Sequence, residues 1–235
     1  MTTGILQGVG VGPGDPELMT LRSVRLVAAA TTVAYVVDAD GRSIARDTAA
    51  AHVAPGAAEL PLHLPMSPVR AEREAARAEA GRQVAARLAE GRDVVFVTEG
   101  DPLLYSSFQH VLAGMPPGTR VRVCPGVTAM TAAAADAVAP LVIEDQRLLL
   151  ATGDDALQHL DRWLAEVDTL VLYKVSRRLA DLASALRDRN ALDGATLVVR
   201  AGHAPDADAW CLPLAAWDGA GVPYMSLAIV RGARP

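Results

Sequence analysis

Two copies of the tripeptide Gly-Asp-Pro are the residues of this chain whose types and spacing best fit a ligand-binding turn. The first copy, Gly14-Asp15-Pro16, closes a run in which glycine fills every second position from Gly8 onward. The second copy, Gly100-Asp101-Pro102, follows shortly after an apolar segment. Glycine tolerates a positive φ and a close approach of the backbone to a ligand. Both turns are therefore candidates for holding a nucleotide or a similar small molecule.

The glycine run does not fit the standard phosphate-binding loops. A dinucleotide fingerprint needs G-x-G-x-x-G. The sixth position is Pro13 when the count starts at Gly8, and Asp15 when it starts at Gly10. A P-loop needs Gly-Lys-Ser/Thr, and this run has no lysine. The Asp15 carboxylate would also repel a phosphate. We therefore expect a tight strand-to-helix turn that approaches something other than a phosphate.

Short β-branched segments alternate with longer helical patterns and predict the elements that would position these turns. Asp15, Pro16 and Glu17 have the features of a helix start, and the helical pattern extends to about Ala30. The predicted strand at residues 93–97 is apolar without alternation after Asp93, as in parallel strands covered on both faces. Further strands are predicted at residues 5–9, 32–36, 59–64, 120–123, 148–151, 169–173, 196–200 and 225–230. Further helices are predicted at residues 42–51, 68–90, 104–113, 127–137, 156–166 and 178–189.

This alternation predicts an α/β fold with parallel strand pairs. We expect two α/β domains, residues 1–143 with both Gly-Asp-Pro turns and residues 144–235. In open α/β sheets, ligands bind beyond the carboxyl ends of the strands. The segments TEGDPLLYSS, CPGVTAM and VRAGHA each follow a predicted strand. They suggest one cleft lined by backbone groups, which would suit an adenosine-type ligand.

Composition excludes several classes of function. A net charge of −5 and an aromatic content of 4% argue against a nucleic-acid partner. The histidines are scattered, and Cys124 and Cys211 have no metal-like spacing, so we expect no metal site and no disulfide. No apolar run reaches the roughly 18 residues that a membrane span requires. The first residues lack the pattern of a secretion signal, which predicts a cytoplasmic protein.

Three blocks of the sequence, taken together, are similar to a known family. The blocks GVGVGPGDPELMTLRSVRLVAAATTVAYV, GRDVVFVTEGDPLLYSSFQHVL and VCPGVTAMTAAAA resemble the tetrapyrrole methylases, the class III S-adenosylmethionine-dependent methyltransferases. The resemblance covers most of the chain. The glycine run, GDPLLYSSF and ELPLHLPMS look most like the branch that methylates precorrin-2 at carbon 20 in cobalamin biosynthesis. The resemblance implies two α/β domains with S-adenosylmethionine in the cleft between them, a tetrapyrrole substrate and a homodimer.

The resemblance also implies roles for particular residues. The predicted donor-binding residues are Pro13, Glu99, Gly100, Asp101, Leu104, Thr128, Ala129, Tyr173, Lys174, Gly202 and Ala204. A proton must leave carbon 20 after methylation, and the candidate bases are Asp15, Asp101 and Tyr105. Asp15 has a second interpretation as a helix cap, and Asp101 as a turn-stabilising carboxylate. The second Gly-Asp-Pro turn would hold the donor, while the first would shape the floor on which the macrocycle meets the methyl group.

The family often has leucine or glycine at the position of Glu99 and a small residue at the position of Leu103, so we expect the loop to contact the donor through its backbone. The substrate carries many carboxylates, and the candidate partners are Arg42, Arg46 and either Arg177 or Arg178.

Other functions remain open. Sister methylases act at other ring carbons or on uroporphyrinogen. A ribosomal-RNA ribose methyltransferase and diphthine synthase share the fold, although the acidic charge weighs against RNA. A non-catalytic module that binds a tetrapyrrole or an adenosyl ligand is an alternative from another class. The sequence does not decide between metal-free and cobalt-loaded substrates.

Overall fold

The computed structural model describes residues 4–203 and 208–232. The chain divides into two compact units, of which the first ends at Thr128 and the second begins at Ala129. The boundary expected from the sequence, between residues 143 and 144, lies further along the chain. Helix α5 (Ala129–Asp136) precedes that position, and its Ala132 and Ala133 pack with strand residues of the second unit.

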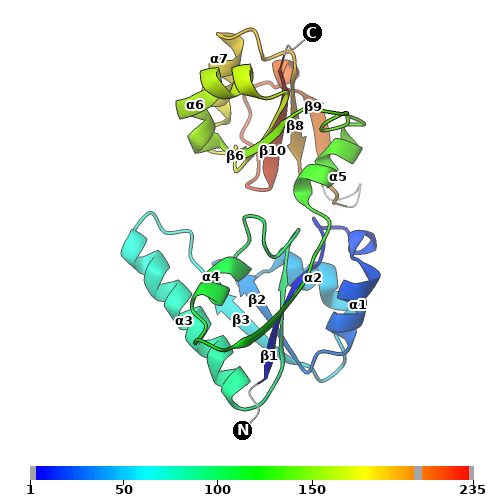
Figure 1. The fold of residues 1–235 in the computed structure, drawn as a ribbon, viewed down its shortest axis with the longest axis vertical. Helices are drawn as coiled ribbons and strands as arrows, with labels where there is room; N and C mark the ends of the chain where they lie inside the picture. Colours follow the sequence, from blue (N-terminus) through cyan, green and yellow to red (C-terminus); the bar gives the residue numbers. More distant parts are fainter. Residues whose placement is uncertain (1–3, 204–207, 233–235) are drawn as a thin grey trace. The chain divides into compact units, whose positions relative to one another are not determined.

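The first unit contains a five-stranded sheet in the order β3-β2-β4-β1-β5, in which every neighbouring pair is parallel (Figure 1). Its strands are β1 (Ile5–Gly10), β2 (Thr32–Val37), β3 (Ala58–His63), β4 (Val94–Thr98) and β5 (Arg120–Cys124). Because all five strands run in one direction, their carboxyl ends lie at one edge of the sheet. The two Gly-Asp-Pro turns follow β1 and β4, which are neighbours, so this edge brings the turns together.

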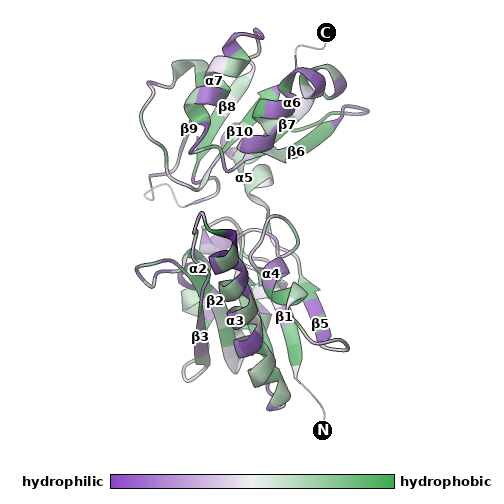
Figure 2. Cartoon of the chain, turned by 90° about the vertical axis from the view of Figure 1, so that its left-hand side faces the viewer, coloured by the Kyte–Doolittle hydropathy of each residue, from purple (hydrophilic) through white to green (hydrophobic). Residues whose placement is uncertain are grey.

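Helices cover both faces of this sheet. Residues of α1 (Leu21–Ala28) and α2 (Ile44–Ala49) share one buried cluster, and residues of α3 (Arg70–Ala89) and α4 (Phe108–Ala113) share another. Hydrophilic and hydrophobic bands alternate along α3 (Figure 2). All five residues of β4 are buried, as expected for a parallel strand covered on both sides.

The helix predicted from Asp15 to about Ala30 is wrong as a single element. Pro16–Leu18 forms only a 3-10 turn, η1, and α1 begins at Leu21. The reason is a second helix cap: the Thr20 hydroxyl accepts a hydrogen bond from the Ser23 N–H at 3.1 Å. A threonine that caps a helix has extended backbone angles, which interrupts the helical path from η1.

The second unit contains a five-stranded sheet in the order β6-β7-β10-β8-β9. Its strands are β6 (Leu148–Thr152), β7 (Thr169–Tyr173), β8 (Ala195–Val199), β9 (Trp210–Pro213) and β10 (Ser226–Arg231). Helices α6 (Gly153–Glu166) and α7 (Leu179–Arg187) pack against one face, and α5 packs against the other.

This second sheet corrects the expectation of parallel pairs throughout. Only β6 and β7 are parallel, whereas β10 is antiparallel to both β7 and β8, and β9 is antiparallel to β8. A parallel neighbour requires a long crossover, usually a helix. The parallel pair β6 and β7 has such a crossover, helix α6, whereas β9 and β10, which flank β8 and are separated by the 3-10 helix η3 (Leu214–Ala216), are not neighbours in the sheet. The sequence pattern did not predict β9, a four-residue strand at the sheet edge.

Candidate functional site

Three strand-end segments of the first unit meet in direct backbone contact. Gly10 ends β1, Gly100 follows β4 and Gly126 follows β5. A Cβ atom at Gly126 would lie 2.1 Å from the carbonyl oxygen of Gly100, and a Cβ at Gly10 would lie 2.4 Å from the same oxygen. Only glycine fits at these two positions without a backbone shift. We call this contact of three residues the glycine junction.

Hydrogen bonds join the two Gly-Asp-Pro segments directly. The Gly100 N–H donates to the carbonyl oxygen of Gly12 at 2.8 Å, and the two residues form an isolated antiparallel bridge. The Val11 N–H donates to the carbonyl oxygen of Thr98 at 3.0 Å. The repeated tripeptide therefore belongs to one site of the first unit, as the order of the strands requires.

Asp101 fixes both its own turn and the segment after β5. Its Oδ1 accepts from the Leu103 N–H at 2.8 Å, and its Oδ2 accepts from the Gly126 N–H at 3.1 Å. Both carboxylate oxygens thus have backbone partners. These contacts are those of a turn-stabilising carboxylate, which is one of the two interpretations of Asp101 from the sequence.

Asp15 and Tyr105, the other two candidate bases beside Asp101, lie on different turns of this edge. Asp15 Oδ1 accepts from the Glu17 N–H at 2.8 Å and caps η1. Tyr105 is 42% exposed and has φ of 51°, a left-handed conformation that is rare for a bulky residue. The next residue, Ser106, is buried and hydrogen-bonds to Thr98 Oγ1 at 2.9 Å. The strained backbone thus presents the Tyr105 side chain at the surface, a placement common at functional sites.

Glu99 turns its side chain toward α2. Its Oε1 accepts from the Ala45 N–H at 3.2 Å, and burial of the carboxyl group raises its pKa above the ordinary value of 4.5. The family resemblance implied that Glu99 belongs to the donor-binding loop, which would contact the donor through its backbone. The carboxyl group of Glu99 contacts the first turn of a helix, a partner that no sequence pattern indicated.

Helix α2 has two further attachments. The Thr48 hydroxyl lies 3.2 Å from the carbonyl oxygen of Gly14, in the first Gly-Asp-Pro turn. On the sheet side, Arg46 forms a bidentate ion pair with Glu59, with an Nη2–Oε1 distance of 2.7 Å, and the Tyr35 hydroxyl donates to the same carboxylate. Hydrogen bonds from Arg46 and Tyr35 lower the pKa of Glu59, while burial raises the pKa of Tyr35.

Large apolar side chains are exposed along the carboxyl edge of the first sheet. Such an edge is normally the ligand side of an open α/β sheet, and exposed apolar surface often marks a binding site. We call these residues the apolar rim; they are Leu21, Ile44, Met66, Val69, Leu103 and Tyr105. They follow four different strands, as expected for residues gathered by the fold and not by the sequence.

In the second unit, α5 is attached at both ends. The Tyr173 hydroxyl oxygen accepts from the Met130 N–H at 3.2 Å, one residue after Ala129. At the other end, the Gly202 N–H donates to Asp136 Oδ2 at 2.8 Å. The sequence predicted Tyr173, Ala129 and Gly202 as site residues but did not indicate Asp136, which secures the Gly202 segment.

The other residues predicted to bind the donor differ in how far they are buried. Pro13 is buried, Thr128 and Leu104 are half-buried, and Lys174 is exposed with φ of 57° directly after β7. Ala204 lies outside the described residues.

The candidate arginines differ in their partners. Three of them form ion pairs: Arg42 with Asp38 and Asp40, Arg46 with Glu59, and Arg178 with Asp154 and Asp181. Arg177 is exposed and forms no ion pair with any residue that the structure describes. Of the four candidates, Arg177 is therefore the one for which the described residues provide no ion pair.

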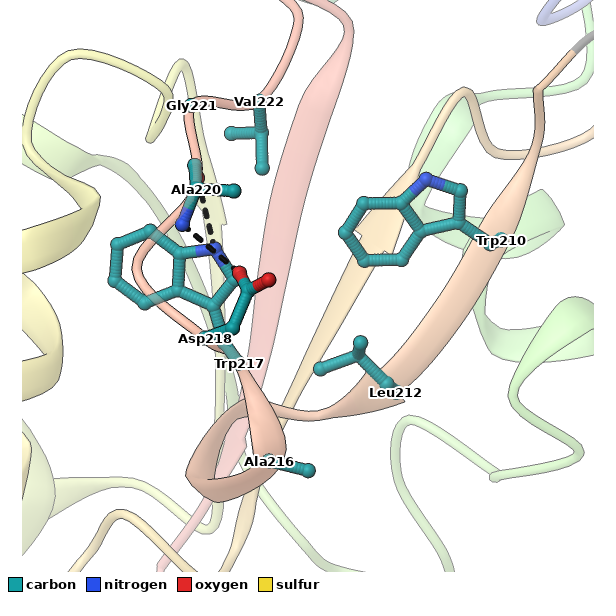
Figure 3. A pocket seen from close by; sticks show the side chains of 8 residues that line it. All are labelled: Trp210, Leu212, Ala216, Trp217, Asp218, Ala220, Gly221 and Val222. Atoms are coloured by element: carbon teal, nitrogen blue, oxygen red, sulfur yellow. Dashed lines mark hydrogen bonds between the residues drawn. The ribbon is translucent and has the colours of Figure 1, made fainter.

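A separate pocket lies in the second unit (Figure 3). Trp210 and Trp217 lie on opposite sides of it, with Leu212 and Val222 between them. The Trp217 indole N–H donates to the carbonyl oxygen of Ala220 at 2.9 Å, which fixes the ring. None of the residues predicted for the site lines this pocket.

The described parts of the chain contain neither a metal-binding cluster nor a membrane-spanning helix. Across residues 4–203 and 208–232, no group of three or more His, Cys, Asp or Glu side chains could hold a metal ion. In the same ranges, no helix is long and apolar enough to cross a membrane.

Comparison with known proteins adds the family. The sequence profile of the tetrapyrrole (corrin/porphyrin) methylases matches residues 6–208. The cobalamin biosynthesis protein CobIJ of Mycobacterium tuberculosis (strain ATCC 25618 / H37Rv) is 37% identical over 239 residues, which cover 98% of this chain and 46% of that protein. This chain therefore spans about half the length of that relative. Precorrin-2 C(20)-methyltransferase of Sinorhizobium sp is 36% identical over 237 residues, covering 97% of this chain and 96% of that protein.

Solved structures agree with the fold. The native form of uroporphyrin III C-methyltransferase from Thermus thermophilus has a TM-score of 0.69 at 26% identity, and the match covers 97% of each chain. The same enzyme complexed with S-adenyl homocysteine has a TM-score of 0.66 at 24% identity, again with 97% of each chain covered. The prediction of two α/β domains is thus confirmed.

Proposed function

The chain belongs to the tetrapyrrole (corrin/porphyrin) methylases, and from that membership we propose that it methylates a ring carbon of a tetrapyrrole in cobalamin biosynthesis, with S-adenosylmethionine as the methyl donor. The structural observation that supports this activity most directly is the glycine junction. It brings the segments after β1, β4 and β5 together at the carboxyl edge of a parallel sheet, where α/β proteins bind ligands.

The charges near the junction suit this donor. Asp15 and Asp101 place carboxylates on both Gly-Asp-Pro turns, which disfavours a phosphate and favours a cation such as a sulfonium. The close packing of Gly10, Gly100 and Gly126 holds the three strand-end segments together, so that their backbone groups are gathered at the edge where we propose the donor binds. We propose donor contacts from Pro13, Gly100, Asp101, Leu104, Thr128 and Ala129, and from Tyr173, Lys174 and Gly202.

We propose precorrin-2, metal-free or cobalt-loaded, as the substrate and carbon 20 as the position methylated. The support is the similarity to the Sinorhizobium enzyme, which covers nearly all of both chains. The apolar rim offers a surface for a flat macrocycle, and Arg177 offers a positive charge for a ring carboxylate. The likeness to uroporphyrin III C-methyltransferase keeps another ring carbon, or uroporphyrinogen, as the second candidate.

Catalysis would rest mainly on alignment. When bound, the donor supplies a methyl group for direct transfer, in which a carbon–carbon bond forms as the carbon–sulfur bond breaks. The residues of this chain would hold the ring carbon in line with that methyl group, and such positioning contributes up to roughly 7–11 kcal/mol in favourable cases. Asp15 or Tyr105 would accept the proton that then leaves the methylated carbon.

One assay tests the proposed function. The purified chain is incubated with S-adenosylmethionine and one tetrapyrrole in each reaction. The three tetrapyrroles are precorrin-2, cobalt-precorrin-2 and uroporphyrinogen. We expect precorrin-2 or cobalt-precorrin-2 to gain the mass of one methyl group. With a ¹³C-labelled donor methyl, we expect the NMR spectrum of the product to show the label on carbon 20. Donor binding in calorimetry without methyl gain on any tetrapyrrole would instead identify a non-catalytic binding module.

We also propose a homodimer, as the family resemblance implies. Light scattering on the purified chain tests this proposal, because a mass near the 24.5 kDa of one chain would contradict it.

A further inference from the structure

The first turn of α2 is capped by residues from two distant parts of the sequence. The Ser43 hydroxyl accepts from the Arg46 N–H at 3.3 Å, which is an ordinary helix cap. The preceding N–H, that of Ala45, is instead bound by Glu99 Oε1 at 3.2 Å. Ala45 is only 2% exposed. Without Glu99, this buried N–H would therefore lose the hydrogen-bond partner that the structure gives it.

The same helix also contacts the other Gly-Asp-Pro turn. Thr48 lies on α2 one turn after Ala45. Its hydroxyl lies 3.2 Å from the Gly14 carbonyl oxygen and 2.8 Å from the carbonyl oxygen of Ile44 in the same helix, so the two oxygens share its single proton. Glu99 directly precedes Gly100 in the second turn. Helix α2 is thus hydrogen-bonded to one turn through Ala45 and to the other through Thr48.

The sheet side of α2 is also fixed. The bidentate ion pair between Arg46 and Glu59 joins the helix to β3, and the Tyr35 hydroxyl joins the same carboxylate to β2. Helix α2 has only six residues and contacts its neighbours at these three points. We therefore expect a change at Glu99 to shift the Gly14 turn.

We propose that Glu99 is a positioning residue that aligns the two Gly-Asp-Pro turns through α2, and that it does not bind the donor with its side chain. This inference rests on the proposed function for its catalytic consequence. If the first turn shapes the floor for the macrocycle and the second holds the donor, α2 sets the distance between the two reacting groups. Loss of Glu99 then impairs turnover more than donor affinity.

Burial supports the choice of the conservative variant. Because burial raises the pKa of the Glu99 carboxyl group, the neutral form is favoured over the ionised form relative to a carboxyl group in water. The amide of Glu99→Gln keeps an oxygen that can accept the Ala45 N–H and carries no charge. Glu99→Gln therefore preserves the hydrogen bond through which we propose that Glu99 positions α2, whereas Glu99→Ala removes the oxygen that accepts from the Ala45 N–H.

The kinetic test compares three variants with the wild type. We expect Glu99→Ala to lower kcat about 10- to 100-fold, as misalignment does, while the Kd for S-adenosylhomocysteine in calorimetry changes less than about 3-fold. Glu99→Gln should restore kcat to within about 3-fold of the wild-type value. Glu74→Ala, an exposed carboxylate on α3, is the control and should change neither quantity.

Hydrogen exchange gives a readout that does not need activity. We expect the Ala45 amide and the amides of Glu17 and Leu18, which donate to Asp15 in the first turn, to exchange about 10-fold faster in Glu99→Ala, and at the wild-type rate in Glu99→Gln. Thr48→Val removes the hydroxyl bonded to the carbonyl oxygens of Gly14 and Ile44, and it should accelerate Glu17 and Leu18 while leaving Ala45 unchanged.

Three results would overturn the proposal. One is wild-type exchange of Glu17 and Leu18 in Glu99→Ala, because α2 would then not couple Glu99 to the first turn. The second is a large loss of donor affinity in both Glu99 variants, which would indicate a side-chain contact with the donor. The third is an unchanged kcat in Glu99→Ala. If the wild type methylates no tetrapyrrole, the proposed function fails, and the exchange experiment still decides whether Glu99 couples the turns.

Discussion

At the scale of single residues, the glycine junction leaves no room for a side chain. The Cβ of an alanine at Gly126 would lie 2.1 Å from the Gly100 carbonyl oxygen and 2.9 Å from the Gly10 Cα. Both neighbours are backbone atoms, so neither can move away without shifting a whole segment. The demand for glycine at Gly10 and Gly126 comes from this close approach between segments and not from a positive φ.

We predict that Gly126→Ala destabilises the first unit by about 1–3 kcal/mol, as overpacking does, and weakens binding of S-adenosylhomocysteine at least about 10-fold. Gly81→Ala is the matched control. It lies in α3 with its nearest contact at 3.5 Å, and alanine favours the helix by roughly 0.5–1 kcal/mol over glycine. Urea unfolding and calorimetry measure both quantities. Equal stability of the two variants would contradict the described packing.

Asp101 offers a second test at this scale. In Asp101→Asn, one carboxylate oxygen becomes an NH₂ group, which cannot accept from both the Leu103 and Gly126 N–H groups. We predict a loss of about 1–2 kcal/mol in unfolding free energy. Asp15→Asn should cost less, because its Oδ1 can still accept from Glu17. If Asp15 is the base, however, this variant loses turnover, and the methyl-transfer assay separates the two roles.

The pKa of Glu99 predicts a dependence of stability on pH. Because the folded-state pKa lies above the ordinary value of 4.5, the folded state binds the proton more tightly than the unfolded state. The contribution of this group to stability is complete below 4.5 and is lost as pH rises through the folded-state pKa. Glu99→Gln has no such group. Its unfolding free energy, measured with urea from about pH 4 to about pH 8, should therefore rise relative to the wild type.

At the scale of elements, α2 shows how a short helix can be positioned by its neighbours. Six residues are too few for a stable isolated helix. Helix α2 is stabilised by the caps from Ser43 and Glu99 and by its ion pair with β3, which compensate for its short length. The position of α2 therefore depends on groups from β2, β3 and the segment after β4.

We predict that Glu59→Gln destabilises the first unit by about 1 kcal/mol, because it removes a charge-assisted bond to Arg46 and weakens the acceptor for Tyr35. The pKa of Glu59 is lowered in the folded state. Its contribution is therefore present above the ordinary value of 4.5 and is lost as pH falls through the lowered pKa. In urea unfolding, the difference from the wild type should shrink in acid. A difference that does not shrink as pH falls below 4.5 would exclude the ion pair as its cause.

At the scale of the whole molecule, each unit has its own sheet and its own buried clusters. The predicted donor-binding residues are distributed over both units. A ligand that binds only the folded state stabilises it by an amount that rises with the logarithm of the ligand concentration relative to Kd. The thermal stability of the chain therefore reports on donor binding without any tetrapyrrole.

We predict that S-adenosylhomocysteine at about 100 times its Kd stabilises the folded state by about 2.7 kcal/mol and raises the midpoint in scanning calorimetry. Adenosine at the same concentration is the ligand control, and Gly126→Ala is the protein control with a reduced shift. No shift with S-adenosylhomocysteine would contradict donor binding.

The sequence by itself determined the α/β class, most of the elements and the two Gly-Asp-Pro turns. These features depend on local periodicity, turn residues and buried β-branched runs, which neighbours along the chain determine. The family resemblance rested on contiguous blocks, and the profile match over residues 6–208 agrees with it. The break of the first helix at Thr20 was missed because two capping signals compete within a few residues.

The tertiary structure alone decided which backbone segments touch and where side chains point. The need for glycine at Gly126 arises from Gly100, which precedes it in the chain by a helix and a strand. The partner of Glu99 is an N–H of Ala45, and the partner of Gly202 is Asp136. The antiparallel β10 and the edge strand β9 likewise depend on pairing across the sheet. Contacts between residues far apart in sequence leave no periodic pattern, so only the folded chain reveals them.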